Sequence, residues 1–190
     1  MIRVAVVDDH HAVRLGLRTA LAAEPGLVPV GTAATASELA PMLYRTDPDV
    51  LLLDYHLPDA DGLSLCREVK ASGPAPRVIL YSAFADASMT VPAIVAGADG
   101  LVHKSALPQE LFEAIRAVAR GGGALPPVSP PLLEAAGLQL DADDLPILAM
   151  LLDRTDPREI AATLGIDDPQ LKQRVRRMLG RLKVPVAGVR

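Results

Sequence analysis

The chain has 190 residues, of which half are apolar and only 3% are aromatic, and its formal net charge is −4. The single cysteine, Cys66, excludes an internal disulfide framework, and no apolar run approaches the roughly 18 residues of a membrane span. Met1 is followed at once by IRVAVVDD, without the basic and apolar regions of a secretory signal. We therefore expect a cytoplasmic protein with an aliphatic core.

The first 120 residues alternate two kinds of segment. Short β-branched runs, typical of strands, occupy residues 2–7, 28–32, 50–53, 78–81 and 101–103. Amphipathic segments with helical spacing lie between and after them, at residues 11–23, 37–46, 61–71, 86–96 and 107–120. This alternation predicts an α/β fold in which a five-stranded parallel sheet is doubly wound, with helices on both faces.

Individual residues indicate where two of these helices begin. Ser37 is the expected N-cap of the second helix. Pro92 falls inside the expected fourth helix, where an interior proline costs about 3 kcal/mol. We therefore expect this helix to begin near Thr90 and to be short.

Residues 121–137 differ in composition from the segments on either side. The sequence GGGALPPVSPPLLEAAG is rich in glycine and proline, which predicts a semi-rigid linker with at most one short helix, at 131–136. The remaining residues, 138–190, have helical patterning, beginning with a helix over about 143–152.

Two later helices in this region have clear starting signals. Asp156 followed by Pro157 indicates a capped start, with Glu159 placed for a capping box, and Asp168 followed by Pro169 indicates a second one. A short connection containing Gly165 joins them. This punctuation predicts a helix-turn-helix unit, although a plain helical hairpin would show the same signals.

The second of these helices favours contact with DNA. Residues 171–190 contain no acidic side chain and these basic ones: Lys172, Arg174, Arg176, Arg177, Arg181, Lys183 and Arg190. A one-sided basic segment is typical of a surface that meets a polyanion. A 3.6-residue period gives an inward apolar stripe of Leu171, Val175, Met178, Leu179 and Leu182. The candidate DNA contacts are Lys172, Gln173, Arg174, Arg176 and Arg177.

Polar side chains stand where four of the expected strands end. They are Asp8, Asp9, Asp54, Ser82 and Lys104. Ligands of parallel α/β sheets bind beyond the carboxyl ends of the strands, so these side chains are expected to converge if the first, third and fourth strands are neighbours. Three carboxylates repel one another and need a cation, and oxygen ligands are typical of Mg²⁺.

The same cluster has the chemistry of phosphoryl transfer. A carboxylate beside a divalent cation and an ammonium is a competent nucleophile toward phosphorus, which assigns that role to Asp54. Lys104 and Ser82 would contact the transferred group. We expect His10, His11 and His103 to pack near this edge and line the pocket, because hard Mg²⁺ prefers oxygen.

Four segments resemble a response-regulator receiver domain in order and spacing: VAVVDDHHAVRLGL, LLLDYHLPDADGLSL, ILYSA and GADGLVHKSALPQEL. The DDH start and the Lys-Ser pair are similar to the NarL/FixJ subfamily, and residues 138–190 resemble its LuxR-type DNA-binding domain. The resemblance implies a flavodoxin-like receiver over residues 1–120, a linker over 121–137 and a helix-turn-helix domain over 138–190.

The resemblance also implies a function, that of a transcriptional regulator rather than an enzyme. A sensor histidine kinase would phosphorylate Asp54, and the protein would bind double-stranded promoter DNA. Mg²⁺ would be held by Asp9 directly, by Asp8 through water, by Asp54 and by the backbone carbonyl of His56.

Such a regulator is expected to act as a homodimer. The apolar positions that we expect to form the dimer interface are Val13 and Leu17 on the first helix and Ile115 on the last helix of the receiver. The same side chains could instead face the sheet.

Departures from the family pattern leave alternatives open. Leu101 stands where receivers usually have an aromatic residue that swings inward on activation, and Arg174 stands where a histidine is common. The alternatives are a regulator controlled without phosphorylation, a binding adaptor without DNA activity, and a phosphatase of the haloacid-dehalogenase type. The phosphatase usually carries a second aspartate two residues after the nucleophile, where this chain has His56.

Overall fold

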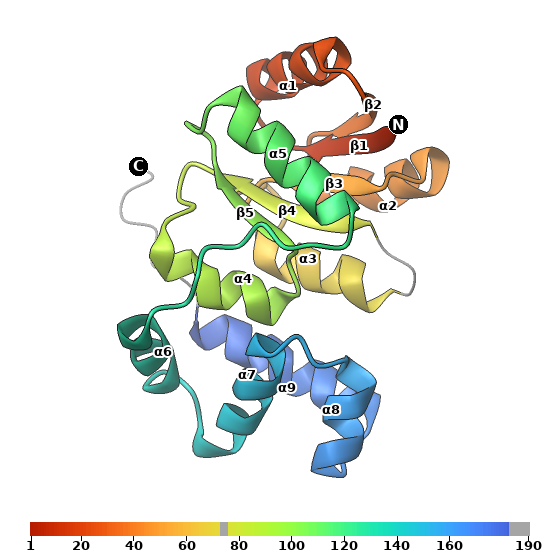
Figure 1. Ribbon diagram of the computed structural model, residues 1–190. Coiled ribbons are helices and arrows are strands. Elements are labelled where there is room, and N and C mark those ends of the chain that lie inside the picture. Colours follow the sequence, from red (N-terminus) through yellow and green to blue (C-terminus); the bar gives the residue numbers. More distant parts are fainter. Residues whose placement is uncertain (73–75, 183–190) are drawn as a thin grey trace.

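The computed structural model, which describes residues 1–72 and 76–182, contains the expected parallel sheet (Figure 1). Its strands are β1 (Ile2–Val7), β2 (Leu27–Ala33), β3 (Val50–Leu53), β4 (Arg77–Ser82) and β5 (Gly100–His103). They lie in the order β2-β1-β3-β4-β5, and every neighbouring pair is parallel. The predicted fold class is confirmed, and β1, β3 and β4 are neighbours.

Helices cover both faces of the sheet. One face carries α1 (His11–Ala23) and α5 (Pro108–Ala119), and the other carries α2 (Ala36–Thr46), α3 (Gly62–Ala71) and α4 (Thr90–Ala96) (Figure 1). Each face has its own aliphatic core, because every strand presents alternate side chains to opposite faces.

The core beneath α1 and α5 contains the side chains that were expected to form a dimer interface. Leu17 and Ile115 are buried there, and Val13 packs against them. These residues therefore stabilise the monomer, and the prediction that they form an intermolecular surface was wrong.

The C-terminal helices pack on the outer side of α3 and α4 (Figure 1). They are α6 (Pro130–Gly137), α7 (Leu145–Leu152), α8 (Pro157–Leu164) and α9 (Asp168–Arg181). Short 3-10 turns, η1 (Ala87–Met89) and η2 (Ala142–Asp144), precede α4 and α7. The apolar side chains of α7, α8 and α9 join the core under α3 and α4 in one continuous cluster.

Helix α4 is buried along its whole length between the sheet and the C-terminal helices. Its sequence, TVPAIVA, contains no charged residue, so both of its sides can lose contact with water. The helix begins at Thr90, as predicted, and Pro92 lies in its first turn. The missing N–H of Pro92 costs little there, because first-turn amides have no partner within the helix.

Residues 121–137 are attached to the sheet and to the C-terminal helices. The backbone of Ala124 pairs with β5: its N–H donates to Asp99 O at 2.8 Å, and Leu101 N–H donates to its carbonyl at 3.0 Å. Helix α6 follows, with Ala136 buried in the core. The segment proposed as a linker thus contains ordered contacts at both ends.

Two expectations from the sequence, the basic C-terminal residues and the absence of a membrane span, can be compared only with the residues that the structure describes. Lys183 and Arg190, the last two basic residues of the C-terminal segment, lie outside the described residues. Within residues 1–72 and 76–182, no helix combines the length and apolar character that crossing a bilayer requires.

Helix α2 is capped by a distant residue. Its N-cap position is Thr35, and the N–H groups of Ala36 and Ser37 donate to the carboxylate of Asp59 at 2.8 and 3.0 Å. These two bonds lower the pKa of Asp59. The prediction that Ser37 is the cap was wrong, because a carboxylate from the β3–α3 loop occupies that position.

The start of α3 lies against the end of β3. A Cβ at Gly62 would stand 2.3 Å from the carbonyl oxygen of Asp54 and 2.7 Å from Cα of Tyr55. The N–H of Gly62 also donates to the carbonyl of Tyr55 at 2.7 Å. A glycine here lets the helix approach the strand end that carries Asp54.

We therefore expect Gly62→Ala to lower the free energy of unfolding by about 2 kcal/mol or more, since backbone atoms must shift. The matched control is Gly16→Ala in α1, where an added Cβ would meet nothing within 4 Å. This substitution should raise the free energy of unfolding by up to about 1 kcal/mol. Urea unfolding followed by circular dichroism measures both. Equal stabilities for the two variants would contradict the close approach.

Candidate functional site

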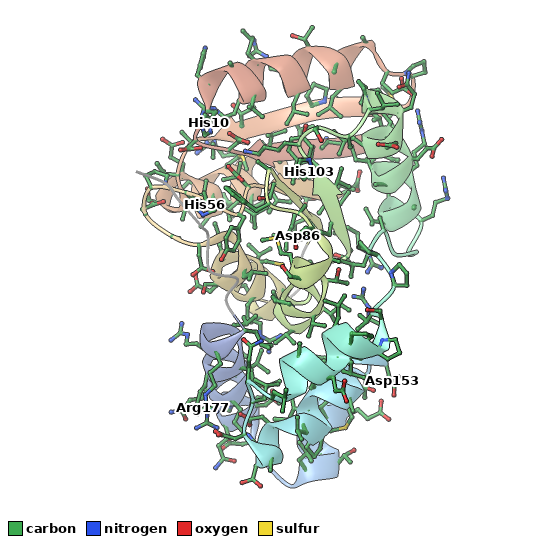
Figure 2. All side chains as sticks on the ribbon, turned by 90° about the vertical axis from the view of Figure 1, so that its left-hand side faces the viewer. His10, His56, Asp86, His103, Asp153 and Arg177 are labelled. Carbon is green, nitrogen blue, oxygen red and sulfur yellow. The ribbon has the colours of Figure 1, made fainter. Side chains whose placement is uncertain are left out.

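The side chains predicted from the strand ends meet at one edge of the sheet. Figure 2 views this edge, where His10 and His56 follow β1 and β3 and His103 is the last residue of β5. Asp8 and Asp54 are nearly inaccessible, at 1% and 3% exposure. The parallel order of the strands places the end of β1 beside the end of β3, which brings these carboxylates together.

Lys104 provides the positive charge at this edge. Its Nζ lies 2.7 Å from Oδ2 of Asp54 and 2.7 Å from Oδ2 of Asp8. Burial disfavours the ammonium, but the hydrogen bonds and charges of Asp54 and Asp8 outweigh it and raise the pKa of Lys104. The lysine therefore stays protonated at neutral pH and bridges the two carboxylates.

At Asp54 the effect of burial outweighs the attraction of the opposite charge, which is the reverse of the balance at Lys104. Burial raises the pKa of Asp54, and the hydrogen bond and charge of Lys104 only partly offset that effect. The charge of Asp8 adds to the increase, and a hydrogen bond from the backbone of His56 opposes it. One ammonium thus serves two buried carboxylates, and ionisation of Asp54 is less favourable than that of a free carboxyl group.

Asp9 and His10 complete an acidic cluster around Asp54. Asp8, Asp9, His10 and Asp54 each offer one ligand atom, and all of these atoms lie within 4.8 Å of one another. The N–H of His10 donates to Asp8 at 2.8 Å, and Nδ1 of His10 lies 2.6 Å from Oδ1 of Asp9. Three carboxylates of this kind fit an oxygen-preferring divalent cation such as Mg²⁺.

A cavity of about 540 Å³ opens in front of Asp54. Its lining residues are Asp9, His10, Asp54, His56, Ser82, Ala83, Phe84 and Lys104. Ser82 is fully buried, and its Oγ accepts a hydrogen bond from the N–H of Phe84 at 3.1 Å. A small anion entering this cavity would therefore meet both Ser82 and Lys104.

The loop after β4 is held by His103, which the sequence analysis had assigned only to pocket lining. Nε2 of His103 lies 2.7 Å from the carbonyl oxygen of Ala83, and Nδ1 lies 2.6 Å from Oγ of Ser105. The ring of Phe84 meets that of His56 edge-on at 5.1 Å. Phe84 was missed, and its only signal was its place two residues after Ser82.

Leu101, which replaces the usual aromatic residue, is buried in β5. It is 6% exposed and belongs to the core under α3 and α4. Ser82 and Leu101 therefore both lie inside the protein. The side chain of Leu101 contributes apolar packing and no ring that could exchange between two positions.

The two predicted helices of the C-terminal region are present, with caps that differ in detail. Asp156 accepts a hydrogen bond from the N–H of Arg158, and no capping box with Glu159 is formed. The cap of α9 is Asp167 rather than Asp168, in a capping box with Gln170. Between the helices, Gly165 adopts a left-handed conformation with φ of 64°.

The apolar stripe of α9 is buried, as predicted. Its inward side chains are all at most 4% exposed: Leu171, Val175, Met178, Leu179 and Leu182. Arg174 and Arg177 flank the stripe and face Asp144, a fully buried carboxylate. Nε of Arg174 donates to Asp144 at 2.8 Å, and Nη2 of Arg177 lies 3.7 Å away. These ion pairs give both arginines a role within the fold.

The remaining candidate DNA contacts face the α/β part of the chain. Lys172, Gln173 and Arg176 line a groove against α3. Arg176 lies 3.6 Å from Glu68 across it. In this arrangement α3 lies alongside the side of α9 that carries these three side chains, and all three remain exposed.

The chain matches the response regulator receiver domain family over residues 4–116. It is 31% identical to the DNA-binding transcriptional activator DevR/DosR of Mycobacterium tuberculosis, over 96% of this chain and 88% of that protein. It is also 31% identical to the nitrate/nitrite response regulator NarP of Escherichia coli, over 96% and 89%.

A solved structure agrees with these matches. A LuxR-family two-component response regulator from Aurantimonas superimposes with a TM-score of 0.62 and 33% identity, covering 70% of this chain and 94% of that one. The family match covers the residues that build the acidic edge, and the two relatives extend through the C-terminal helices. The chain therefore belongs to the response regulator family, and within it to the NarL/FixJ type.

Proposed function

We propose that this response regulator is a cytoplasmic transcriptional regulator that a sensor histidine kinase phosphorylates on Asp54. The observation that carries the proposal is the placement of Asp54. Its buried carboxylate faces a cavity, 2.7 Å from the Lys104 ammonium and beside two further carboxylates. A phosphoryl group in this cavity would find a nucleophile, a fixed positive charge and a hydroxyl donor.

The proposed transfer is a single displacement at phosphorus. One carboxylate oxygen of Asp54 attacks the phosphorus of the kinase's phosphohistidine, forming the P–O bond as the P–N bond breaks. The imidazole leaves with the electron pair of that bond. Lys104, freed from Asp54 Oδ2, balances charge on the phosphoryl oxygens, and Ser82 donates its hydroxyl to one of them.

Mg²⁺ would be held by Asp8, Asp9, Asp54 and the backbone carbonyl of His56. When bound, it supplies the positive charge that one lysine cannot provide for three carboxylates. The protein's own part is to hold the oxygens in place: the N–H of His10 donates to Asp8, and the backbone N–H of His56 donates to Asp54.

The C-terminal helices are the proposed DNA-binding part, with residues 138–190 forming the domain and α9 entering the major groove. The capping box leaves the start of α9 well defined, and Lys172, Gln173 and Arg176 stand on one side of it. Because α3 lies alongside this side of α9, α9 must separate from α3 before the major groove of a duplex can surround it. A homodimer of the separated form would bind two half-sites about one helical turn apart.

Leu101 supports one alternative, a regulator controlled without phosphorylation. The aromatic half of the usual switch is missing, whereas the serine half, Ser82, is in place. Phosphorylation and DNA binding are therefore tested separately.

The first test is chemical labelling of Asp54. Acetyl phosphate with Mg²⁺ should add one phosphoryl mass to the intact chain and none to Asp54→Asn. The control Asp153→Asn, at an exposed carboxylate in the C-terminal part (Figure 2), should be labelled like the unmodified protein. Mass spectrometry of the whole protein measures all three, and equal labelling of Asp54→Asn would refute the assignment.

The second test concerns stability and pH without Mg²⁺. Because burial raises the folded-state pKa of Asp54, its protonated form contributes stability that is present at low pH and is lost as the pH rises through that pKa. Asp54→Asn lacks this loss, so its Tm in EDTA at pH 7 should exceed that of the unmodified chain. The difference should shrink as the pH approaches 4.

Addition of Mg²⁺ should reverse the order of the two Tm values. A ligand that binds the folded state raises its stability in proportion to ln(1 + [L]/Kd), and Asp54→Asn lacks one proposed ligand. Asp153→Asn should follow the unmodified chain throughout. A lower Tm for Asp54→Asn at pH 7 in EDTA would contradict the charge balance described above.

The third test measures DNA binding by full-length protein with and without beryllofluoride. If Lys172 contacts a phosphate, Lys172→Ala should weaken binding to all duplexes alike and reduce the slope of log K against log salt by about 0.9. If it contacts a base, the loss should be confined to duplexes that contain that base, and their binding free energy should weaken by about 1–3 kcal/mol. Fluorescence anisotropy measures both, with Arg45→Ala on α2 as control. Unchanged binding by Lys172→Ala on every duplex would exclude this contact.

A further inference from the structure

A groove lies between α3 on one side and the start of α8 and much of α9 on the other. Two adjoining cavities, of about 580 and 480 Å³, share Arg67, Ala71 and Lys172 in their walls. The shared residues make them parts of one groove, with α3 on one side and the C-terminal helices on the other. Its size suits a small organic ligand.

The groove is lined by more positive than negative charge. Its cations are Arg67 and Lys70 on α3, Arg158 on α8, and Lys172 and Arg176 on α9. Two of them have carboxylate partners: Lys70 lies 2.6 Å from Asp99, and Arg176 lies 3.6 Å from Glu68. In the part of the chain that the structure describes, Arg67, Arg158 and Lys172 form no ion pair with a carboxylate.

Asp156 and Asp168, the other acidic residues of the groove, form no ion pair with these three among the described residues. Asp156 accepts a hydrogen bond from the backbone N–H of Arg158 as the cap of α8. Asp168 lies in the first turn of α9, where a negative charge is favourable to the helix. The folded arrangement thus brings unpaired cations from two parts of the chain to one place.

Arg67 supplies an independent observation. Its Nε is buried and has no hydrogen-bond partner among the described residues. Burial also lowers the pKa of its guanidinium. A buried donor without a partner is uncommon in native proteins, because its lost contact with water is not replaced. An anion in the groove would meet the terminal nitrogens of this guanidinium, which line the groove, and would compensate its partly buried charge.

We propose that this groove binds a small molecule bearing two or more phosphate groups, held between Arg67 of α3 and the cations of α8 and α9. Arginine and lysine are the residues that recognise phosphate oxygens, and cations on opposite walls suit an anion with separated charges. Ala71, Pro169 and Leu179 add an apolar portion to the wall, next to Lys172. A nucleoside attached to the phosphates would have room there.

Binding would connect α3 to α9 and so oppose the separation that DNA binding requires. This consequence rests on the proposed function, whereas the binding itself does not. The same two side chains, Lys172 and Arg176, would contact either the small anion or DNA. The ligand would therefore act as a negative effector of promoter binding.

Tripolyphosphate is the first probe, titrated into the full chain by calorimetry in Mg²⁺-free buffer. We expect saturable binding that is at least tenfold weaker in Arg67→Gln. Arg67 lies on α3, so its loss separates binding in the groove from binding to the basic helix α9 alone. Arg45→Gln, which removes an exposed arginine on α2, should bind like the unmodified chain.

Lys172→Gln tests the opposite wall and keeps the proposal falsifiable if Arg67→Gln does not fold. Its affinity should also fall at least tenfold, whereas Asp153→Asn, at an exposed carboxylate outside the groove, should retain full affinity. No binding by the unmodified chain at millimolar tripolyphosphate, or equal affinity in Lys172→Gln, would overturn the proposal. Adenosine and guanosine triphosphates then distinguish the sources: tighter binding than tripolyphosphate indicates a nucleotide, and equal binding indicates an inorganic polyphosphate.

A separate measurement follows DNA binding by fluorescence anisotropy. Tripolyphosphate should weaken duplex binding by the unmodified chain more than by Arg67→Gln. If the full chain binds tripolyphosphate as expected but binds no duplex even at low salt, the groove stands and the proposed function fails. Equal inhibition of both proteins would show competition on α9 alone and would remove the groove's regulatory role.

Discussion

The charge balance around Asp54 is the constraint on which the rest of the molecule depends. A carboxylate that is 3% exposed at the end of a fully buried strand is costly unless a cation compensates for it. The strand order brings Lys104 to Asp54, but it also brings Asp8, which shares the same ammonium. The edge therefore keeps excess negative charge, which favours binding of a divalent cation. It also makes the surrounding loops sensitive to any change of charge at Asp54.

The sequence was sufficient to predict which residues form this edge, because the signals that locate the strand ends are local. Apolar runs that stop at Asp8 and Asp54 locate the ends of β1 and β3, and the alternation of segments predicts a parallel sheet. Features set by distant partners could not be predicted. The cap of α2 comes from Asp59, more than 20 residues along the chain. Periodicity gave Leu17 and Ile115 an apolar face, yet it could not say whether that face meets the sheet or a second copy.

The same limit explains which features of the C-terminal helices could be predicted from the sequence and which could not. The 3.6-residue period identified which side of α9 is apolar, and that side is buried. It could not identify the polar partners, because Asp144 lies 30 residues before Arg174 and reaches it only in the folded chain. Nor could it reveal that Lys172 faces α3. A basic side chain on a predicted DNA-binding helix can therefore serve folding, domain contact or DNA, and only tertiary structure separates these roles.

The energetics of the contact between the two parts limit how phosphorylation could act. Its polar component is small: the Arg176–Glu68 pair is exposed, and such pairs contribute about 1 kcal/mol or less. Arg154 adds one hydrogen bond, from Nη1 to Ala98 O at 3.0 Å. Shifting a two-state equilibrium from 1:99 to 99:1 requires about 5.5 kcal/mol, so most of the difference must come from the apolar contacts of α4.

The connection from Asp54 to α4 is short. Ser82 lines the cavity in front of Asp54, Thr90 begins α4, and His103 holds the intervening loop at Ala83. Because Leu101 provides no ring that could exchange positions, this loop is the covalent path by which a phosphoryl group on Asp54 would alter the packing of α4. A movement of α4 would disturb its contacts with α7 and α9 directly, since all seven of its residues are buried. The same movement would widen or close the cationic groove beside α3, so that a phosphoryl group on Asp54 and a ligand in the groove would act on one shared interface.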